Sequence, residues 1–162
     1  MARRLRPVGL DFIEDAPVRL VFAADTVAPP EAVYHALAEE VAGWADWFGA
    51  VTLARPTHGG AGREVRLRGG VRFQETVMAA DPERRYAYRV DTTNVPGVRA
   101  LLEEWRLTPI GTGTHVRWTF AADGPTPFRL GLAAARPGLG HSFRTAVRSL
   151  DRRLSARRAS GR

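Results

Sequence analysis

The sequence predicts an α+β fold in which a curved antiparallel sheet of about six to seven strands wraps around a long C-terminal helix. Apolar and polar residues alternate through most of residues 51–120, which is typical of strands with one buried face. After residue 138 the apolar residues recur every three or four positions, as they do on an amphipathic helix. Because an antiparallel sheet with one apolar face needs a cover, we expect this helix to provide it.

The segment before the alternating region predicts one strand followed by two short helices. The strand covers Val18–Ala24. The first helix begins near Pro30, whose fixed φ suits a first turn, and it ends at Gly43. The second helix covers Trp44–Phe48 and carries large aromatic side chains.

The alternating region is divided into strands by turns rich in glycine, proline and aspartate. A two-residue loop at Gly111 and Thr112 pairs Trp105 with Trp118, so that the apolar faces of the two strands coincide. A turn centred on residues 82–83 has the same effect in the preceding hairpin. Its expected pairs are Val77 with Tyr88 and Glu75 with Val90. The expected strands cover residues 51–54, 63–69, 71–79, 84–90, 101–108 and 114–120.

The C-terminal region returns to helical spacing. We expect Pro137–Gly138 to separate a short helix, Phe128–Ala135, from the long helix that follows, because proline interrupts helical hydrogen bonding. The apolar stripe of the long helix consists of Leu139, Phe143, Val147, Leu150 and Leu154.

Composition excludes several kinds of chemistry. All 24 basic residues are arginine, and the sequence contains neither lysine nor cysteine. A Schiff-base or P-loop lysine, a cysteine nucleophile, a disulfide and a thiolate metal site are therefore impossible. The four histidines are scattered, and no two have the spacing of metal ligands, so we expect no metal and no cofactor. Much of the net charge of +7 comes from arginines near the two ends of the chain.

The length of 162 residues fits one domain, which we expect to span residues 17–156. Residues 1–16 form an N-terminal extension that either packs on the domain or extends away from it, and residues 157–162 form a basic tail. No apolar run is long enough to span a bilayer, and the basic N-terminus lacks the apolar stretch of a secretory signal. We therefore expect a cytoplasmic protein, either monomer or homodimer.

The order of these elements resembles the START-like or SRPBCC superfamily, the helix-grip fold that includes polyketide cyclases, dehydrases and lipid-transfer proteins. The resemblance covers residues 17–154 and implies a deep cavity between the concave face of the sheet and the long helix. It marks the fold better than the activity, because one scaffold carries binding, transport and cyclisation. The matching stretches are APVRLVFAADTVAPPEAVYHAL, WADWFGAV, FQETVMAADPERRYAYRV, EEWRLTPIGTGTHVRWTF and SLDRRL.

Two carboxylates, Glu75 and Glu103, fall on the otherwise apolar face of their strands. One strand lies between them, so their backbones should be roughly 10 Å apart, a spacing that can flank a bound molecule. Such carboxylates either have a raised pKa and act as acid, base or ligand anchor, or form a structural salt bridge. The expected salt-bridge partner is an arginine of the covering helix, such as Arg144 or Arg148.

Aromatic and aliphatic side chains on the inner face serve equally well as packed core or as the wall of a cavity. The expected ligand-binding residues are Phe73, Tyr86, Tyr88, Trp105, Trp118, Phe143, Val147, Trp44 and Trp47. One loop with apolar residues is either an entrance gate or an ordinary hairpin connection. It consists of Asn94, Val95, Pro96, Gly97 and Val98.

Three functions fit these patterns. The leading one is the binding of a hydrophobic metabolite such as a lipid, a polyketide or an isoprenoid. The second is a cofactor-free cyclase or dehydratase that uses Glu75 or Glu103 as a general acid or base. The third, binding of nucleic acid or an anionic membrane through the arginines, lacks a recognition motif, so no specific nucleic-acid partner is expected.

Overall fold

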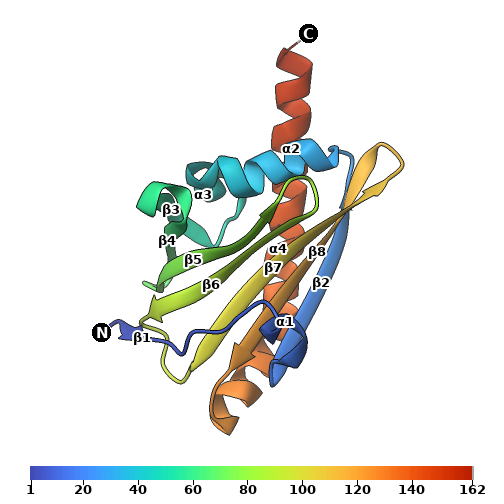
Figure 1. Ribbon diagram of the computed structural model, residues 1–162. Coiled ribbons are helices and arrows are strands. Elements are labelled where there is room, and N and C mark those ends of the chain that lie inside the picture. Colours follow the sequence, from blue (N-terminus) through green and yellow to red (C-terminus); the bar gives the residue numbers. More distant parts are fainter. Residues whose placement is uncertain (162) are drawn as a thin grey trace.

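The computed structural model describes residues 1–161; Arg162, the last residue of the predicted basic tail, lies outside this range. A strongly curved antiparallel sheet encloses one long helix, and short helices close one end of the sheet (Figure 1). The predicted fold class is confirmed. The strands are β1 (Arg3–Arg4), β2 (Val18–Thr26), β3 (Val51–Thr57), β4 (Gly62–Leu67), β5 (Arg72–Asp81), β6 (Arg85–Thr93), β7 (Ala100–Ile110) and β8 (Gly113–Asp123). The helices are α1 (Phe12–Asp15), α2 (Pro30–Tyr34), the π-helix η1 (His35–Glu39), the 3₁₀-helices η2 (Val41–Gly43) and η3 (His58–Gly60), α3 (Trp44–Trp47) and α4 (Thr126–Ser160).

The sheet has the strand order β2-β8-β7-β6-β5-β4-β3, with β1 paired to β6 beside this path. Strands β3 to β8 form a meander, and the first long strand, β2, returns to pair with the last strand. This order places β6 between β5 and β7, so the strands that carry Glu75 and Glu103 are second neighbours.

The β7–β8 hairpin has the predicted register, with Trp105 opposite Trp118. The β5–β6 hairpin also forms the predicted pair Val77–Tyr88, but its turn is one residue longer than expected. Glu83 adopts a left-handed φ of 63°, and a bulge between Val77 and Ala79 restores the pairing. A bulge adds one residue to one strand of a pair, so this bulge compensates for the extra residue of the turn.

Pro56 and Pro137 lie inside a strand and a helix that the sequence analysis expects to be interrupted near them. Strand β3 continues through Pro56, because β3 is an edge strand and proline there removes no ladder hydrogen bond. Helix α4 also runs unbroken past Pro137, so the predicted separation from a short helix at Phe128–Ala135 is wrong. Residues 133–138 are exposed, and water can therefore satisfy the carbonyl of Ala133 that the proline leaves without a partner.

The N-terminal residues pack on the convex face and at the edge of the sheet (Figure 1). Strand β1 pairs with the end of β6, and Leu5 joins the main core. Helix α1 covers a second, smaller hydrophobic cluster on the outer face. This cluster contains Val8, Phe12, Ile13, Ala100, Leu102 and Ala121.

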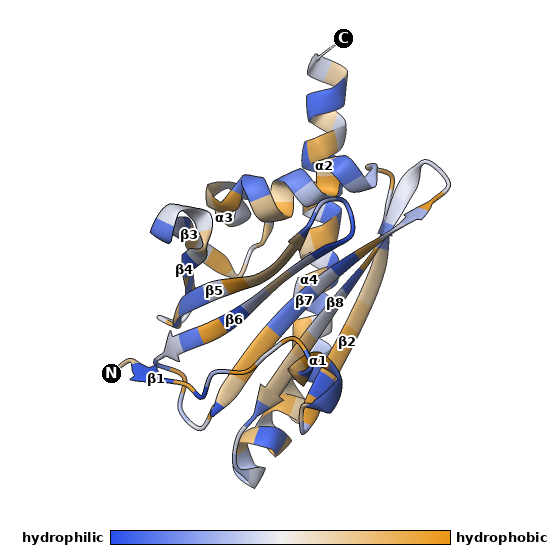
Figure 2. Cartoon of the chain, viewed as in Figure 1, coloured by the Kyte–Doolittle hydropathy of each residue, from blue (hydrophilic) through white to orange (hydrophobic). Residues whose placement is uncertain are grey.

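Helix α4 lies along the concave face and buries one side of its middle section. Apolar and polar residues alternate along the strands and around α4 (Figure 2). Of the predicted stripe, Phe143, Val147, Leu150 and Leu154 are buried and Leu139 is partly exposed. The helix continues to Ser160 and projects beyond the sheet, so the first residues of the predicted tail are helical (Figure 1). Among residues 1–161 no helix combines the length and the apolar character that a membrane crossing requires.

Candidate functional site

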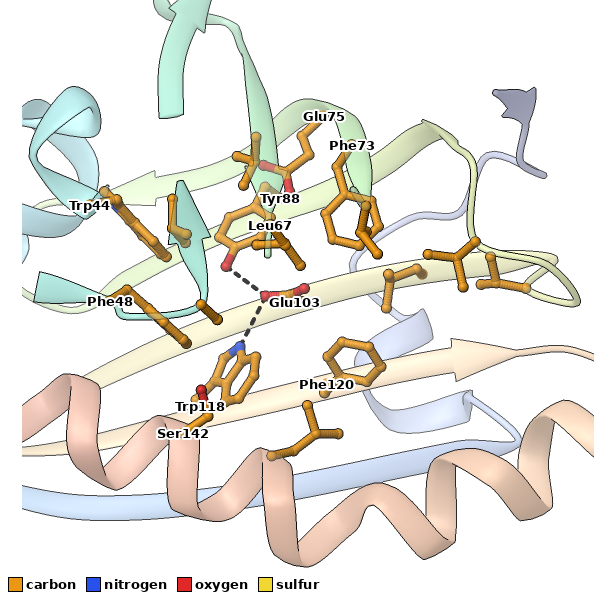
Figure 3. Close-up of a pocket in the computed structure, with 18 of the residues that line it drawn as sticks. Trp44, Phe48, Leu67, Phe73, Glu75, Tyr88, Glu103, Trp118, Phe120 and Ser142 are labelled. Carbon is orange, nitrogen blue, oxygen red and sulfur yellow. Dashed lines mark hydrogen bonds between the residues drawn. The ribbon is translucent and has the colours of Figure 1, made fainter. Parts of the chain in front are cut away.

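A cavity of about 260 Å³ lies between the concave face of the sheet and α4 (Figure 3). Residues of α3, strands β3 to β8 and the first half of α4 line it, and nearly all of them are apolar. Strand alternation explains this, because every second residue of each strand points inward. Glu103 and Tyr88 lie in the middle of the sheet-side wall, facing Trp118 and Ser142 (Figure 3).

Nine of the lining residues remain partly exposed, and six of them form the mouth of the cavity; the other three are Ala50, Phe120 and Ser142. The six mouth residues come from the β4–β5 turn, the β6–β7 loop and the first half of α4, so three separate segments surround the opening. The mouth consists of Leu67, Val71, Val95, Phe128, Leu132 and Leu139.

The predicted aromatic wall divides into two parts. Trp44, Phe73, Tyr88 and Trp118 line the cavity. The other predicted ligand-binding residues do not reach it, because α3 and α4 pack directly on that half of the sheet and fill it with side chains. These residues are Tyr86, Trp105, Phe143, Val147 and Trp47, all buried in the core.

Trp105 is the centre of this packed half and has no exposed surface. Its ring lies 5.6 Å from the ring of Trp118, 5.6 Å from that of Trp44 and 5.7 Å from that of Phe143, measured between centroids. Such distances are typical of stacked and edge-to-face aromatic pairs. This closely packed aromatic cluster therefore closes the cavity at one end.

Within the predicted gate loop, Val95 and Val98 line the cavity, whereas Pro96 and Gly97 do not. Gly97 has a φ of 85°, and a side chain there would press on the ring of Phe128 at the start of α4. The loop and the beginning of α4 thus form one continuous rim on this side of the mouth.

Hydrogen bonds hold this loop at both ends. The Asn94 side chain accepts from the backbone N–H of Arg72 and donates to the carbonyl of Gly70, which ties the loop to the β4–β5 turn. The guanidinium of Arg3 donates to the carbonyls of Val95 and Val98. The predicted gate is therefore linked both to the opposite side of the mouth and to the N-terminal strand.

Glu75 is buried at the inner end of the cavity and forms an ion pair with Arg63 of β4. The Arg63 Nε atom donates to Glu75 Oε2 at 2.5 Å, and the side chains of both residues are almost completely buried. Burial raises the pKa of Glu75, while the charge and the hydrogen bond of Arg63 oppose this rise. The predicted partners on the covering helix, Arg144 and Arg148, are instead exposed, because α4 turns those positions toward solvent.

Aromatic rings surround the guanidinium of Arg63. Its Cζ atom lies 3.8 Å from the ring centroid of Tyr88 and 4.5 Å from that of Trp44. Cation–π attraction is strongest where water is excluded, as it is here. Because the Nη1 atom has no hydrogen-bond partner among the described residues, these ring faces and Glu75 provide most of the stabilisation of the charge.

Within residues 1–161 Glu103 has no arginine partner, and neutral donors hold its carboxyl group. The Tyr88 hydroxyl donates to Glu103 Oε2 at 2.6 Å, and Trp118 Nε1 donates to the same oxygen at 3.1 Å (Figure 3). Trp105 Nε1 in turn donates to the Tyr88 hydroxyl oxygen at 3.0 Å. Burial, together with the negative charge of Glu75, raises the pKa of Glu103 to about 7.

Sequence reasoning identified Glu75 and Glu103 but missed Arg63. A signal was present, since Arg63 has the same alternating position as Val65 and Leu67, which line the cavity. An arginine in such a pattern normally belongs to a strand end near solvent. Only the pairing of β4 with β5, which places Arg63 opposite Glu75, shows that its charge is neutralised inside the protein.

The curved sheet, the enclosed helix and the cavity between them define a START-like protein of the helix-grip class. Solved structures share this fold. A START superfamily protein from Mycobacterium smegmatis aligns with a TM-score of 0.67 at 9% identity, covering 85% of this chain and 97% of that chain. The Zhui aromatase/cyclase from Streptomyces aligns with a TM-score of 0.68 at 20% identity, covering 86% and 94%. At these identities the likeness establishes the fold alone.

Sequence comparison gives the family. The family described as polyketide cyclase / dehydrase and lipid transport matches residues 18–155. Uncharacterized proteins of Mycobacterium tuberculosis and Mycobacterium bovis are each 34% identical to this chain over 157 residues, covering 94% of both sequences. The chain belongs to the polyketide cyclase / dehydrase and lipid transport family, which confirms the predicted resemblance.

Proposed function

We propose that the chain binds a hydrophobic small molecule in the cavity between the sheet and α4. The observation that carries this proposal is the apolar wall of a cavity of about 260 Å³ between the sheet and α4. Protein interiors contain few voids larger than a water molecule, and such a void reduces packing energy unless a ligand fills it.

The size of the cavity favours a compact ligand. Pockets for drug-sized molecules have volumes of roughly 300–1,000 Å³, so the volume of this cavity, about 260 Å³, lies just below that range. A ring-containing polyketide or a short isoprenoid fits such a volume better than a long extended acyl chain. Burial of the ligand's apolar surface then supplies the main driving force for binding.

A blocked cavity tests this proposal. Leu132 belongs to the mouth, whereas Leu130 lies on the same helix with 66% of its surface exposed. The variant Leu132→Trp should reduce the amount of bound apolar compound at least tenfold, because the indole occupies the ligand's space. The matched control Leu130→Trp should retain the wild-type amount. The measurement is solvent extraction of each purified protein, followed by mass spectrometry.

Two outcomes would contradict carriage in the cavity. One is an equal amount of bound compound in Leu132→Trp and wild type, which would place the ligand elsewhere. The other is wild-type protein that contains no apolar compound at all, which would exclude stable carriage.

A second candidate function is cofactor-free catalysis with Glu103 as general acid. The observation that favours it is a cavity carboxyl whose pKa of about 7 suits proton transfer near neutral pH. An enzyme of this kind would accelerate deuterium exchange at the α-carbon of a bound ketone such as 1-tetralone, because Glu103 protonates the carbonyl oxygen while a solvent molecule removes the α-proton, and D₂O then returns a deuteron to that carbon. Glu103→Gln would abolish the effect. A carrier would bind the ketone without exchange.

A further inference from the structure

The two oxygens of Glu103 have different surroundings. Oε2 accepts hydrogen bonds from both Tyr88 and Trp118, whereas no described residue bonds to Oε1. The residue lines the cavity and is 7% exposed although it lies in the middle of a central strand. Because the flanking strands cover its backbone, this exposed surface faces the cavity, where the carboxyl is drawn in Figure 3.

The donors on Oε2 determine where a proton on Glu103 must sit. An indole N–H can only donate, so Trp118 requires Oε2 to be an acceptor. Trp105 also donates to the oxygen of Tyr88, which leaves the Tyr88 proton free to point toward Oε2. With two donors directed at Oε2, the proton of a neutral Glu103 sits on Oε1.

We propose that neutral Glu103 presents an O–H at Oε1 to the cavity and selects ligands with a carbonyl oxygen as hydrogen-bond acceptor. This inference rests on the proposed ligand-binding function and specifies the class of ligand as compact, neutral carbonyl compounds such as cyclic ketones, quinones and lactones. Carboxylates and phosphates fit poorly, because the nearby charge of Arg63 is already neutralised by Glu75.

Few other groups can provide the same contact. The ionisable side chains that face Glu103 are Tyr88 on β6, Glu75 on β5 and Arg63 on β4. Burial and the Glu103 charge raise the pKa of Tyr88 well above its ordinary value, so its hydroxyl remains a neutral donor to Oε2. The parts of β8 and α4 that line the cavity carry no ionisable side chain. Glu75 also lines the cavity, but Arg63 neutralises its charge, so we assign the titration that the ligand senses to Glu103.

The direction of the pH effect follows from this geometry. Below its pKa Glu103 donates a hydrogen bond to a carbonyl oxygen, and above it the carboxylate repels that oxygen. Affinity for a ketone is thus present at low pH and is lost as pH rises through about 7. A hydrocarbon of the same shape lacks the acceptor, so its affinity should change little.

The test compares 1-tetralone with tetralin, which differ only in the carbonyl group. Binding is followed at pH 5.5 and pH 8.5 through the indole N–H signals of Trp105 and Trp118 in ¹⁵N-labelled protein. In wild type the ratio of ketone affinity to hydrocarbon affinity should fall by a factor of roughly 2–10 at the higher pH, the equivalent of one hydrogen bond. In Glu103→Gln the amide accepts from Tyr88 and donates to the cavity, so the ratio should stay high at both pH values.

The possible failures are distinguishable. If tetralin binds but the affinity ratio in wild type is the same at both pH values, the inference is wrong and the binding function stands. The same conclusion follows if Glu103→Gln shows the wild-type dependence on pH. If neither compound binds, the proposed function itself fails.

Discussion

Replacing Arg63 with methionine is expected to lower the free energy of unfolding by about 3–5 kcal/mol. The substitution leaves the carboxylate of Glu75 buried without Arg63, its positive partner in the structure. It also removes the guanidinium that fills the space between the rings of Tyr88 and Trp44. Methionine keeps most of the side-chain volume, so the predicted loss reflects the unpaired charge more than a cavity.

Two variants accompany Arg63→Met in urea unfolding experiments. Arg66→Met changes an arginine on the same strand whose side chain is 46% exposed, and it should cost less than 1 kcal/mol or so. Combining Arg63→Met with Glu75→Leu removes both buried charges and should restore much of the lost stability. The account is wrong if Arg63→Met is as stable as Arg66→Met.

Replacing Glu103 with glutamine is expected to change how stability depends on pH. Burial, with the charge of Glu75, raises the pKa of Glu103 from its ordinary value of 4.5 to about 7 in the folded protein. The folded state therefore holds the proton more tightly, and stability falls as pH rises between these two values. This difference corresponds to about 3 kcal/mol above pH 7.

The effect is isolated by comparing variants across pH. Glu103→Gln keeps the acceptor for Tyr88 and Trp118 but cannot ionise, so it should match wild type near pH 4.5 and exceed it by about 3 kcal/mol near pH 8. Glu31→Gln removes the same charge at an exposed position, so its free energy of unfolding should depend on pH as that of wild type does. Parallel stability curves for wild type and Glu103→Gln would show that the carboxyl is not held in its neutral form.

Much of the architecture was predictable, because the alternation of apolar residues along two strands and the length of the turn between them indicate the same strand register. The alternation in β7 and β8, with the two-residue turn between them, predicts the register that places Trp105 opposite Trp118. Helical spacing likewise predicts that Phe143 faces the sheet. These are local patterns, and each is confirmed in the fold.

Where the observed elements differ from the predicted ones, the cause lies in features that the local sequence pattern does not determine. Pro137 predicts a break, but an exposed turn tolerates the missing hydrogen bond, and α4 stays continuous. The turn of the β5–β6 hairpin is one residue longer than expected, and the bulge between Val77 and Ala79 compensates for it; alternation alone predicts neither feature. The short helix after β2 becomes the π-helix η1, and no feature of the sequence indicates that change.

The candidate site was predictable in its residues but not in its partners. Alternation places Glu75 and Glu103 on the inner face, and the structure gives the two carboxyls opposite surroundings. Strand pairing brings Glu75 to Arg63, whereas the hydrogen-bond donors to Glu103 are the neutral side chains of Tyr88 and Trp118. Which aromatic residues line the cavity depends on how far α3 and α4 fill the sheet, and this is a property of tertiary packing.

The central claim, that the space between the sheet and α4 accepts an apolar molecule, is tested most directly by nuclear Overhauser effects from bound tetralin. The account predicts contacts between tetralin protons and the methyl groups of Val98 and Leu132, which line the cavity. It predicts none to Val8 and Ile13, which belong to the hydrophobic cluster on the outer face. Contacts confined to the outer cluster, or no contacts with tetralin in excess, would contradict the claim.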